Sequence, residues 1–279
     1  MNLPLRPRYL IGVAGVGTEI GKTFVSVQLL TELSGRGWFV NARKPAQSVA
    51  SGETTDSELL GQASGEDPAL VCSPSRTYLV PMAPPMAATQ LGFDPPQLGE
   101  LIEEVSRSWG GRVADIGLVE TAGGVASPLG IDGDNAQFLG SLEPELILLV
   151  ADAGLGTINS IRLSVGHLQV AAPGVPIVVW LNHFDHANEL HILNREWLQR
   201  VDGLRCLTTV DECAALVEAS IELICGHCGL GLGLHLQPCE TQLDPKRYCE
   251  RCGRKLNVTI SPNDVSARCK VHGMVAWQS

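Results

Sequence analysis

Short apolar runs alternate with longer amphipathic segments along the first 224 residues. The runs with strand character cover residues 9–14, 39–42, 116–120, 146–151, 177–181 and 204–208. Segments with helical periodicity lie between them, at residues 24–33, 97–109, 158–172, 190–201 and 211–223. Nearly continuous hydrophobic strands that alternate with helices predict an α/β fold, in which a parallel sheet is covered by helices on both faces. Ligands of such sheets bind beyond the carboxyl ends of the strands.

The first apolar run leads directly into a glycine-rich loop. Residues 15–23 read Gly-Val-Gly-Thr-Glu-Ile-Gly-Lys-Thr, and the first predicted helix follows. Backbone N–H groups of such a loop can surround phosphate oxygens, while Lys22 can reach the terminal phosphates and the Thr23 hydroxyl can bind Mg²⁺. The loop from Gly15 to Gly21 is one residue longer than the common phosphate-loop pattern. Because strand, loop and helix occur in the order that the motif requires, we predict a P-loop NTPase-like fold with a nucleoside triphosphate site.

Four polar residues follow later predicted strands or begin later helices. Lys44 comes directly after the second run, so it is either a surface lysine or a second cation in the same crevice. Asp56 is a candidate helix cap or a candidate metal ligand. Glu120 closes a buried run, where an ionised carboxylate is costly unless a cation such as Mg²⁺ accompanies it. Asn182 ends another run, and its amide can both donate to and accept from an adenine edge.

Charge and hydropathy narrow the classes of function. Lys and Arg number 20 against 30 Asp and Glu, and the net charge of −10 disfavours nucleic-acid binding as the principal activity. No apolar stretch approaches the ~20 residues of a membrane-spanning helix, and the first residues lack the apolar segment of a secretory signal. We therefore expect a cytoplasmic protein without membrane contact, whose nine cysteines are metal ligands or buried thiols rather than disulfides.

The cysteines divide the chain into two predicted domains, residues 1–224 and residues 225–279. Three scattered cysteines belong to the first part and six to the second. The second part also has seven basic and four acidic residues, a net charge of +3, which leaves −13 for the first. A change of charge and of cysteine content at the same place predicts an α/β domain followed by a separate small module.

The polar motifs of the first domain, taken in order, resemble those of the dethiobiotin synthetase family over residues 8–222. The shared features are the phosphate loop, Lys44, Asp56, Glu120 and the motifs at residues 121–129, 154–159 and 182. The resemblance implies an ATP-dependent ligase that carboxylates 7,8-diaminononanoate with CO₂ and closes the cyclic urea of dethiobiotin. It further implies Mg²⁺ as cofactor and a homodimer.

The resemblance also implies a role for each site residue. The phosphates of ATP would be held by Gly17, Thr18, Glu19, Ile20, Gly21 and Lys22. The Mg²⁺ ligands would be Thr23, Asp56 and Glu120. The diamine and its carbamate would face Thr18, Lys44 and Ser48, with Lys44 and Lys22 as catalytic cations. The substrate carboxylate would meet Gly156, Thr157, Ile158 and Asn159 of the neighbouring subunit, and Asn182 would read the base.

Three positions depart from the family pattern. Gly17 stands where the family usually has Asp, Thr121 replaces a common Gly, and the residues around Lys44 differ from the usual ones. Two other interpretations stay open for the first domain. One is a nucleotide-switched scaffold ATPase that binds a client through its tail, and the other is a ligase like those of cobyrinate amidation.

The tail carries three metal-ligand pairs. Cys225 and Cys228 form one C-x2-C pair, Cys249 and Cys252 a second, twenty residues later, and Cys269 with His272 a third, after sixteen more. Two such pairs complete a tetrahedral shell, so a metal site is predicted. The shell consists either of the first two pairs or of the last two, and we favour the last two, around a small hairpin of residues 253–260 and 265–268.

The segment of residues 248–273 resembles the small biotin synthase auxiliary proteins. That resemblance implies a docking or auxiliary module for biotin synthase. The modest positive charge of the tail separately disfavours nucleic acid as its partner. It leaves Cys225, Cys228 and Cys239, with His227 or His235, for a second or partial site. Zn²⁺ is the default metal for a shell of thiolates, and an iron–sulfur group is the alternative.

Overall fold

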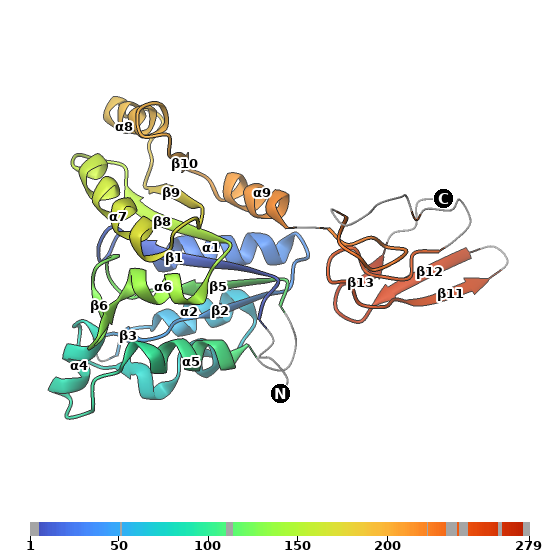
Figure 1. The fold of residues 1–279 in the computed structure, drawn as a ribbon, viewed down its shortest axis with the longest axis horizontal. Coiled ribbons are helices and arrows are strands. Elements are labelled where there is room, and N and C mark those ends of the chain that lie inside the picture. The colour runs from blue at the N-terminus through green and yellow to red at the C-terminus, as the bar shows by residue number, and fades with distance from the viewer. Residues whose placement is uncertain are drawn as a thin grey trace.

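The computed structural model describes residues 6–50, 52–109, 114–221, 223–232, 239, 245–261 and 264–275. A six-stranded parallel sheet forms the centre of the larger lobe (Figure 1). Its strands, in spatial order, are β10 (Arg205–Leu207), β9 (Ile177–Asn182), β8 (Leu146–Asp152), β1 (Tyr9–Gly15), β5 (Ile116–Glu120) and β2 (Val40–Arg43). The parallel sheet that the apolar runs predict is confirmed.

Successive residues of β1 face two different hydrophobic cores. Leu10 and Ala14 belong to one core, whereas Tyr9, Ile11 and Val13 belong to the other. This alternation arises because neighbouring side chains of a strand point to opposite faces of the sheet. Both faces of β1 are buried, which is why the sequence of the strand is continuously apolar.

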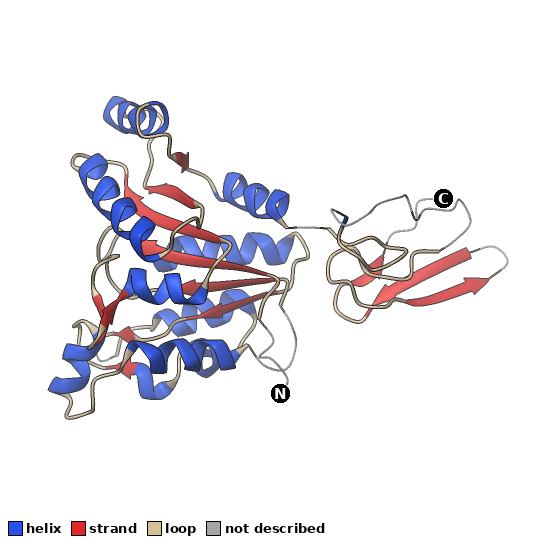
Figure 2. Cartoon of the chain, in the orientation of Figure 1, coloured by secondary structure: helices blue, strands red, loops and turns tan. Residues whose placement is uncertain are grey.

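Helices cover both faces of the sheet (Figure 2). One face packs against α1 (Lys22–Gly35), α2 (Asp56–Ser64) and α9 (Val210–Ser220). The other packs against α4 (Pro84–Gln90), α5 (Leu98–Ser108), α6 (Asn135–Leu142), α7 (Thr157–Ala171) and α8 (Glu189–Arg200). The fold is therefore the predicted P-loop type of α/β architecture.

Several short elements connect these helices and strands, and the apolar pattern did not predict them. They are β3 (Gln47–Ser48), α3 (Pro68–Val71), the 3-10 turn Pro74–Arg76, β4 (Thr77–Tyr78), β6 (Pro128–Gly130) and β7 (Gly133–Asp134). The pairs β3–β4 and β6–β7 form two small sheets beside the carboxyl ends of the main strands. They bring the chain back toward the phosphate loop.

The C-terminal segment forms a smaller lobe after α9 (Figure 1). Its three-stranded antiparallel sheet consists of β11 (Asn257–Ser261), β12 (Asp264–Cys269) and β13 (Gly273–Val275). The predicted hairpin corresponds to β11 and β12, and β13 adds a third strand. Cys249, Leu256, Ala267 and Cys269 form its buried centre. Among the described residues, no helix is both long and apolar enough to pass through a bilayer.

Candidate functional site

The phosphate loop joins β1 to α1 at the centre of the sheet. Gly21 has a φ of 88°, and a Cβ there would lie 2.2 Å from Asn182 Nδ2, so only glycine fits this position. Asn182 is buried at the end of β9 and donates from Nδ2 to Ile20 O at 2.9 Å. The structure thus brings Asn182 against the underside of the loop, and its contact with a base stays a prediction.

Lys22, the first residue of α1, folds back over the loop. Its Nζ donates to Gly17 O at 3.0 Å, and the residue is 7 % exposed. Burial, together with the nearby Lys44 ammonium, lowers the pKa of Lys22 to about 8. A cation held inside a ring of loop N–H groups can neutralise a polyphosphate.

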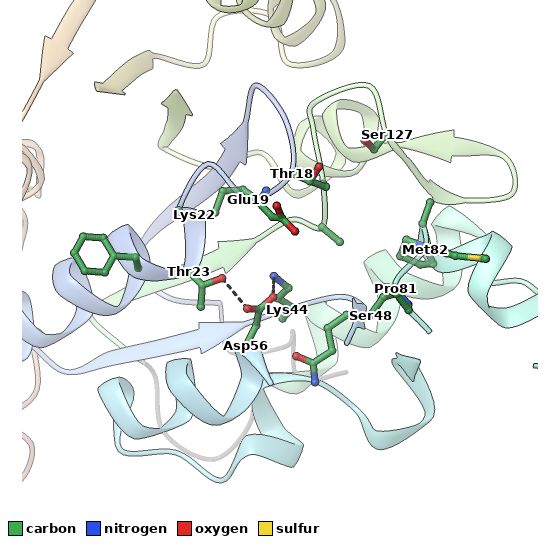
Figure 3. Close-up of a pocket in the computed structure, with 17 residues that line it drawn as sticks. Thr18, Glu19, Lys22, Thr23, Lys44, Ser48, Asp56, Pro81, Met82 and Ser127 are labelled. Carbon is green, nitrogen blue, oxygen red and sulfur yellow. Dashed lines mark hydrogen bonds and ion pairs between the residues drawn. The ribbon is translucent and has the colours of Figure 1, made fainter. Parts of the chain in front are cut away.

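Thr23, Asp56 and Glu120 converge beside the loop. Figure 3 shows Thr23 and Asp56 of this group facing each other. The Thr23 hydroxyl lies 2.8 Å from both Asp56 Oδ1 and Glu120 Oε1, and its proton can serve one of them at a time. Glu120 is fully buried and accepts a second hydroxyl bond, from Ser26, at 2.6 Å. Two carboxylates and a hydroxyl are the oxygen donors that Mg²⁺ prefers, so the donor set fits the expected ion.

Lys44 bridges the same two carboxylates. Its Nζ lies 2.5 Å from Asp56 Oδ2 and 2.6 Å from Glu120 Oε1. Burial would lower the pKa of Lys44, but the two carboxylates outweigh it and raise that pKa above its ordinary value. For Asp56, burial would raise the pKa, but the Lys44 ammonium lowers it by more, so the pKa of Asp56 is below its ordinary value. Of the two sequence-based options, Lys44 therefore belongs to the crevice and not to the surface.

The start of α2 explains how Asp56 becomes available to the site. Thr55 is the N-cap residue, and it forms a reciprocal capping box with Glu58. Because Thr55 satisfies the free backbone N–H of the helix, the carboxylate of Asp56 is not needed as a cap. It points instead toward Thr23 and Lys44 (Figure 3).

A cleft of about 720 Å³ opens at these residues. Its lining includes the predicted Thr18, Glu19, Gly21, Lys22, Thr23, Lys44, Ser48 and Asp56. The opposite wall consists of Pro81, Met82, Ala83 and Pro84, with Gln47 and Ser127 beside them, and sequence reasoning missed the first four and Gln47. The proline-rich character of residues 81–85 was the available signal.

The three departures from the family pattern leave the cluster of Thr23, Lys44, Asp56 and Glu120 intact. A Cβ on Gly17 would meet no atom within 4 Å, so the loop there is open. Thr121 is buried and donates to Val13 O at 3.0 Å, within the sheet. Arg43 points away from the cleft, pairs with Glu66 at 2.8 Å and lies 4.5 Å from the Trp109 ring centre.

The loop before α7 lies outside the lining of the cleft. Gly156 has a φ of 90° and precedes Thr157, which begins the helix and donates to Asp152 O at 2.5 Å. Leu155 beside them is 93 % exposed. The predicted contact of Gly156, Thr157, Ile158 and Asn159 with substrate in a neighbouring subunit stays a prediction.

The tail brings together two separate groups of ligand atoms. One consists of Cys249, Cys252, Cys269 and His272, whose ligand atoms all lie within 4.8 Å of one another. The other consists of Cys225, Cys228 and Cys239. The pair Cys225 and Cys228 therefore does not share a group of ligand atoms with Cys249 and Cys252 in this structure. The pair Cys269 and His272 does. His227 lies in the described region with a buried Nδ1, whereas His235 lies outside it.

The group of four has the spacing of a mononuclear tetrahedral site. Metal–sulfur bonds of about 2.3 Å place two sulfurs about 3.8 Å apart at tetrahedral angles. Cys252 Sγ lies 3.7 Å from Cys269 Sγ, and His272 Nδ1 lies 3.3 Å from Cys249 Sγ. Burial would raise the pKa of Cys249, but hydrogen bonds from His272 and two backbone N–H groups lower it to about 6. The residues thus fit a metal ion of the Zn²⁺ type.

Known proteins resemble the larger lobe. The family model described as an AAA domain matches residues 10–220. An ATP-dependent dethiobiotin synthetase BioD of Parafrankia sp. (strain EAN1pec) is 35 % identical over 67 % of this chain and 78 % of its own length. Its counterpart in Brachyspira hyodysenteriae is 31 % identical over 77 % of this chain and 97 % of its own. A plasmid partition protein of Borrelia burgdorferi has a TM-score of 0.49 at 13 % identity, over 77 % of this chain and 97 % of that one.

Proposed function

This chain belongs to the family of ATP-dependent dethiobiotin synthetases, which are enzymes, and from that premise we propose that it converts 7,8-diaminononanoate, CO₂ and ATP to dethiobiotin in biotin biosynthesis. The observation that carries the proposal is the convergence of Thr23, Lys44, Asp56 and Glu120 beside the phosphate loop. Phosphoryl transfer needs positioning and charge neutralisation rather than a nucleophilic side chain. The cluster supplies both.

The reaction consists of three bond-forming steps. One substrate amine adds to CO₂ and loses a proton, which gives a carbamate. A carbamate oxygen then attacks the γ-phosphorus of ATP, and ADP leaves with the electrons of the broken bond. Finally the second amine attacks the carbonyl carbon of the mixed anhydride and gives up a proton, phosphate leaves with the electrons of the broken C–O bond, and the cyclic urea closes.

We assign the neutralisation of negative charge in this reaction to two lysines. Lys22 neutralises the phosphates from within the loop, where it already bonds to Gly17 O. To Lys44, which is held between Asp56 and Glu120, we assign the charge of the carbamate oxygen that attacks the terminal phosphate. Thr23, Asp56 and Glu120 would hold Mg²⁺, which would supply further charge neutralisation at the phosphate oxygens. Preorganised cations are effective here because the site is largely buried.

The substrate chain is proposed to lie along the open side of the cleft. Thr18 and Ser48 line it, on either side of Lys44 (Figure 3). The wall of Pro81, Met82, Ala83 and Pro84 offers an apolar surface for the methylene chain. The proposal includes a homodimer in which Gly156, Thr157, Ile158 and Asn159 receive the substrate carboxylate across the interface, and the exposed loop at Leu155 supports it.

The test is incorporation of label from bicarbonate. The protein is incubated with ATP, Mg²⁺, labelled bicarbonate and 7,8-diaminononanoate, and acid-stable label is compared with ADP released. Equal amounts of both support the proposal. ADP release that is indifferent to the diamine would instead indicate a nucleotide-switched scaffold, and ADP release that requires ammonia and a different carboxylate would indicate an amidating ligase.

For the tail we propose a Zn²⁺-stabilised module that docks biotin synthase. The close spacing of all four ligand atoms supports a single ion, because an iron–sulfur cluster distributes its ligands over two or more irons and so does not hold all of them this close together. Metal analysis of the full chain, with Cys252→Ser as comparison, tests the ion. Copurification of biotin synthase with the wild type but not with Cys252→Ser would support docking, and equal recovery would exclude it.

A further inference from the structure

A carboxylate of the larger lobe contacts the proposed metal site of the smaller one. Asp115, the residue before β5, is 1 % exposed, and its Oδ2 lies 2.5 Å from His272 Nε2. The same oxygen accepts from the backbone N–H of Phe39 at 3.0 Å. Asp115 Oδ1 is buried and has no hydrogen-bond partner within the described part of the chain. Since a buried carboxylate is costly without partners, the imidazole and the Phe39 N–H together stabilise Asp115 in this position.

His272 uses its two ring nitrogens in opposite directions. Nδ1 faces the sulfurs of Cys249 and Cys269, at 3.3 and 3.7 Å, while Nε2 faces Asp115. A histidine that binds metal through one nitrogen commonly donates from the other to a carboxylate, which fixes the ring and its tautomer. Here that carboxylate lies 157 positions away in the sequence, in the other lobe.

A second contact lies beside the first. Arg251, between the ligands Cys249 and Cys252, donates to Gly37 O at 2.5 Å and to Arg36 O at 3.2 Å. Its guanidinium lies 4.9 Å from the Trp38 ring centre. The carbonyls it reaches belong to the two residues that directly follow the C-terminal end of α1, where the helix dipole favours a cation. A Cβ on Gly37 would lie 2.8 Å from Arg251 Nη1, so glycine gives this side chain its room.

We propose that Asp115 is a positioning residue of the tail metal site, so that metal binding and docking of the tail on the ligase lobe strengthen each other. The metal holds the Cys249–Cys252 turn and His272 in the orientation that meets Asp115 and α1. Docking in turn holds His272 in the orientation that meets the metal. Linkage requires that each process favours the other by the same factor. This inference rests on the proposed metal site but not on the ligase reaction.

The first experiment measures Zn²⁺ affinity of the full-length protein by competition with a chromogenic chelator. Asp115→Asn keeps the size of the side chain but removes the charge, and we expect a 10- to 100-fold weaker Kd, about the size of outer-carboxylate losses elsewhere. Asp94→Asn, at an exposed aspartate, is the matched control and should leave Kd unchanged. An unchanged Kd for Asp115→Asn would overturn the proposal.

The second experiment needs no variant, so it decides the question even if Asp115→Asn fails to fold. Hydrogen exchange of the peptide that contains Gly37, Trp38 and Phe39 is compared in Zn²⁺-loaded and chelator-treated wild type. Slower exchange in the loaded protein is expected, because the Phe39 N–H bonds to Asp115. Equal exchange refutes the linkage while leaving the metal site standing. A wild type that binds no Zn²⁺ refutes both, whatever the ligase assay gives.

Discussion

Lys22 and Lys44 occupy the same cleft with opposite pKa shifts. The pKa of Lys22 is lowered to about 8 by burial and by the Lys44 charge, whereas the pKa of Lys44 is raised by its two carboxylate partners. The two lysines therefore divide the work: Lys44 stays charged throughout the neutral range, and Lys22 is the cation whose charge depends on pH near neutrality.

The pH dependence of nucleotide binding follows from Lys22. Its protonated form, present below about pH 8, attracts phosphate, and that attraction is lost as the pH rises through 8. We expect the Kd for ATP to weaken above pH 8, by at most about tenfold per pH unit for one proton. Titration by calorimetry from pH 6.5 to 9.5 measures it. Lys22→Arg, whose cation persists, should flatten the profile, and an equally steep profile in that variant would assign the titration to another group.

Glu120 links the metal set to Lys44, so neutralising it affects both. For Glu120→Gln we expect a higher Mg²⁺ requirement and a loss of turnover of about 10² or more, the size typical of removing a preorganised charge. Mg²⁺ titration of the ligase rate measures the effect. Glu196→Gln on the exposed surface of α8 is the control. Wild-type Mg²⁺ dependence in Glu120→Gln would remove Glu120 from the ligand set.

At the scale of elements, two glycines in helices have opposite surroundings. A Cβ on Gly140 of α6 would lie 2.1 Å from Ala171 O at the end of α7, whereas a Cβ on Gly166 of α7 would meet nothing within 4 Å. The first glycine allows two helices to approach closely. The second has no packing neighbour in the described part of the chain, and a glycine weakens the interior of a helix.

We therefore expect alanine to act in opposite directions at these two positions. Gly140→Ala should destabilise by about 1–3 kcal/mol through overpacking. Gly166→Ala should stabilise by about 0.5–1 kcal/mol through helix propensity. Chemical denaturation of the two variants, each the control of the other, measures both. A destabilised Gly166→Ala would show that this helix face has a contact beyond the single chain.

The main strands could be predicted from sequence because both of their faces are buried, and β8 (Leu146–Asp152) is an unbroken apolar run that ends in a polar residue. The phosphate loop could be predicted equally well from sequence, since its phosphate-binding residues are contiguous in the chain. By contrast, α6 follows two tiny strands and spans eight residues, too short for a clear helical period. The wall at Pro81 and Met82 was missed because it has no reactive side chain and meets the loop only through the fold.

At the scale of the whole molecule, the two lobes meet through contacts that local sequence patterns cannot reveal. Asp115 is separated from His272 by 157 positions, and Arg251 from Gly37 by 214. Neither pair belongs to a motif. The ligand spacing of the tail predicted a metal site, but not that the site faces the beginning of β5.

The tail has a small buried centre, so its stability should depend on the metal. Among the tail residues that the structure describes, four form that centre, and two of them are the ligands Cys249 and Cys269. We expect chelator-treated protein to be cut by trypsin in the tail at Arg254 and Lys255 at least tenfold faster, while sites in the larger lobe are cut at unchanged rates. Mass spectrometry of the fragments measures both rates. Resistance that persists without metal would show that packing alone maintains the tail.

The bridge that Lys44 makes between Asp56 and Glu120 bears on the order in which ligands arrive. A free divalent cation would have to displace an ammonium group already in contact with both carboxylates. Nucleotide that binds with its cation already attached can offset the cost of that displacement, because its phosphate oxygens replace the carboxylates as ion-pair partners of Lys44. We therefore expect the nucleotide-free enzyme not to bind free Mg²⁺ and to take up the ion only as the Mg²⁺–nucleotide complex.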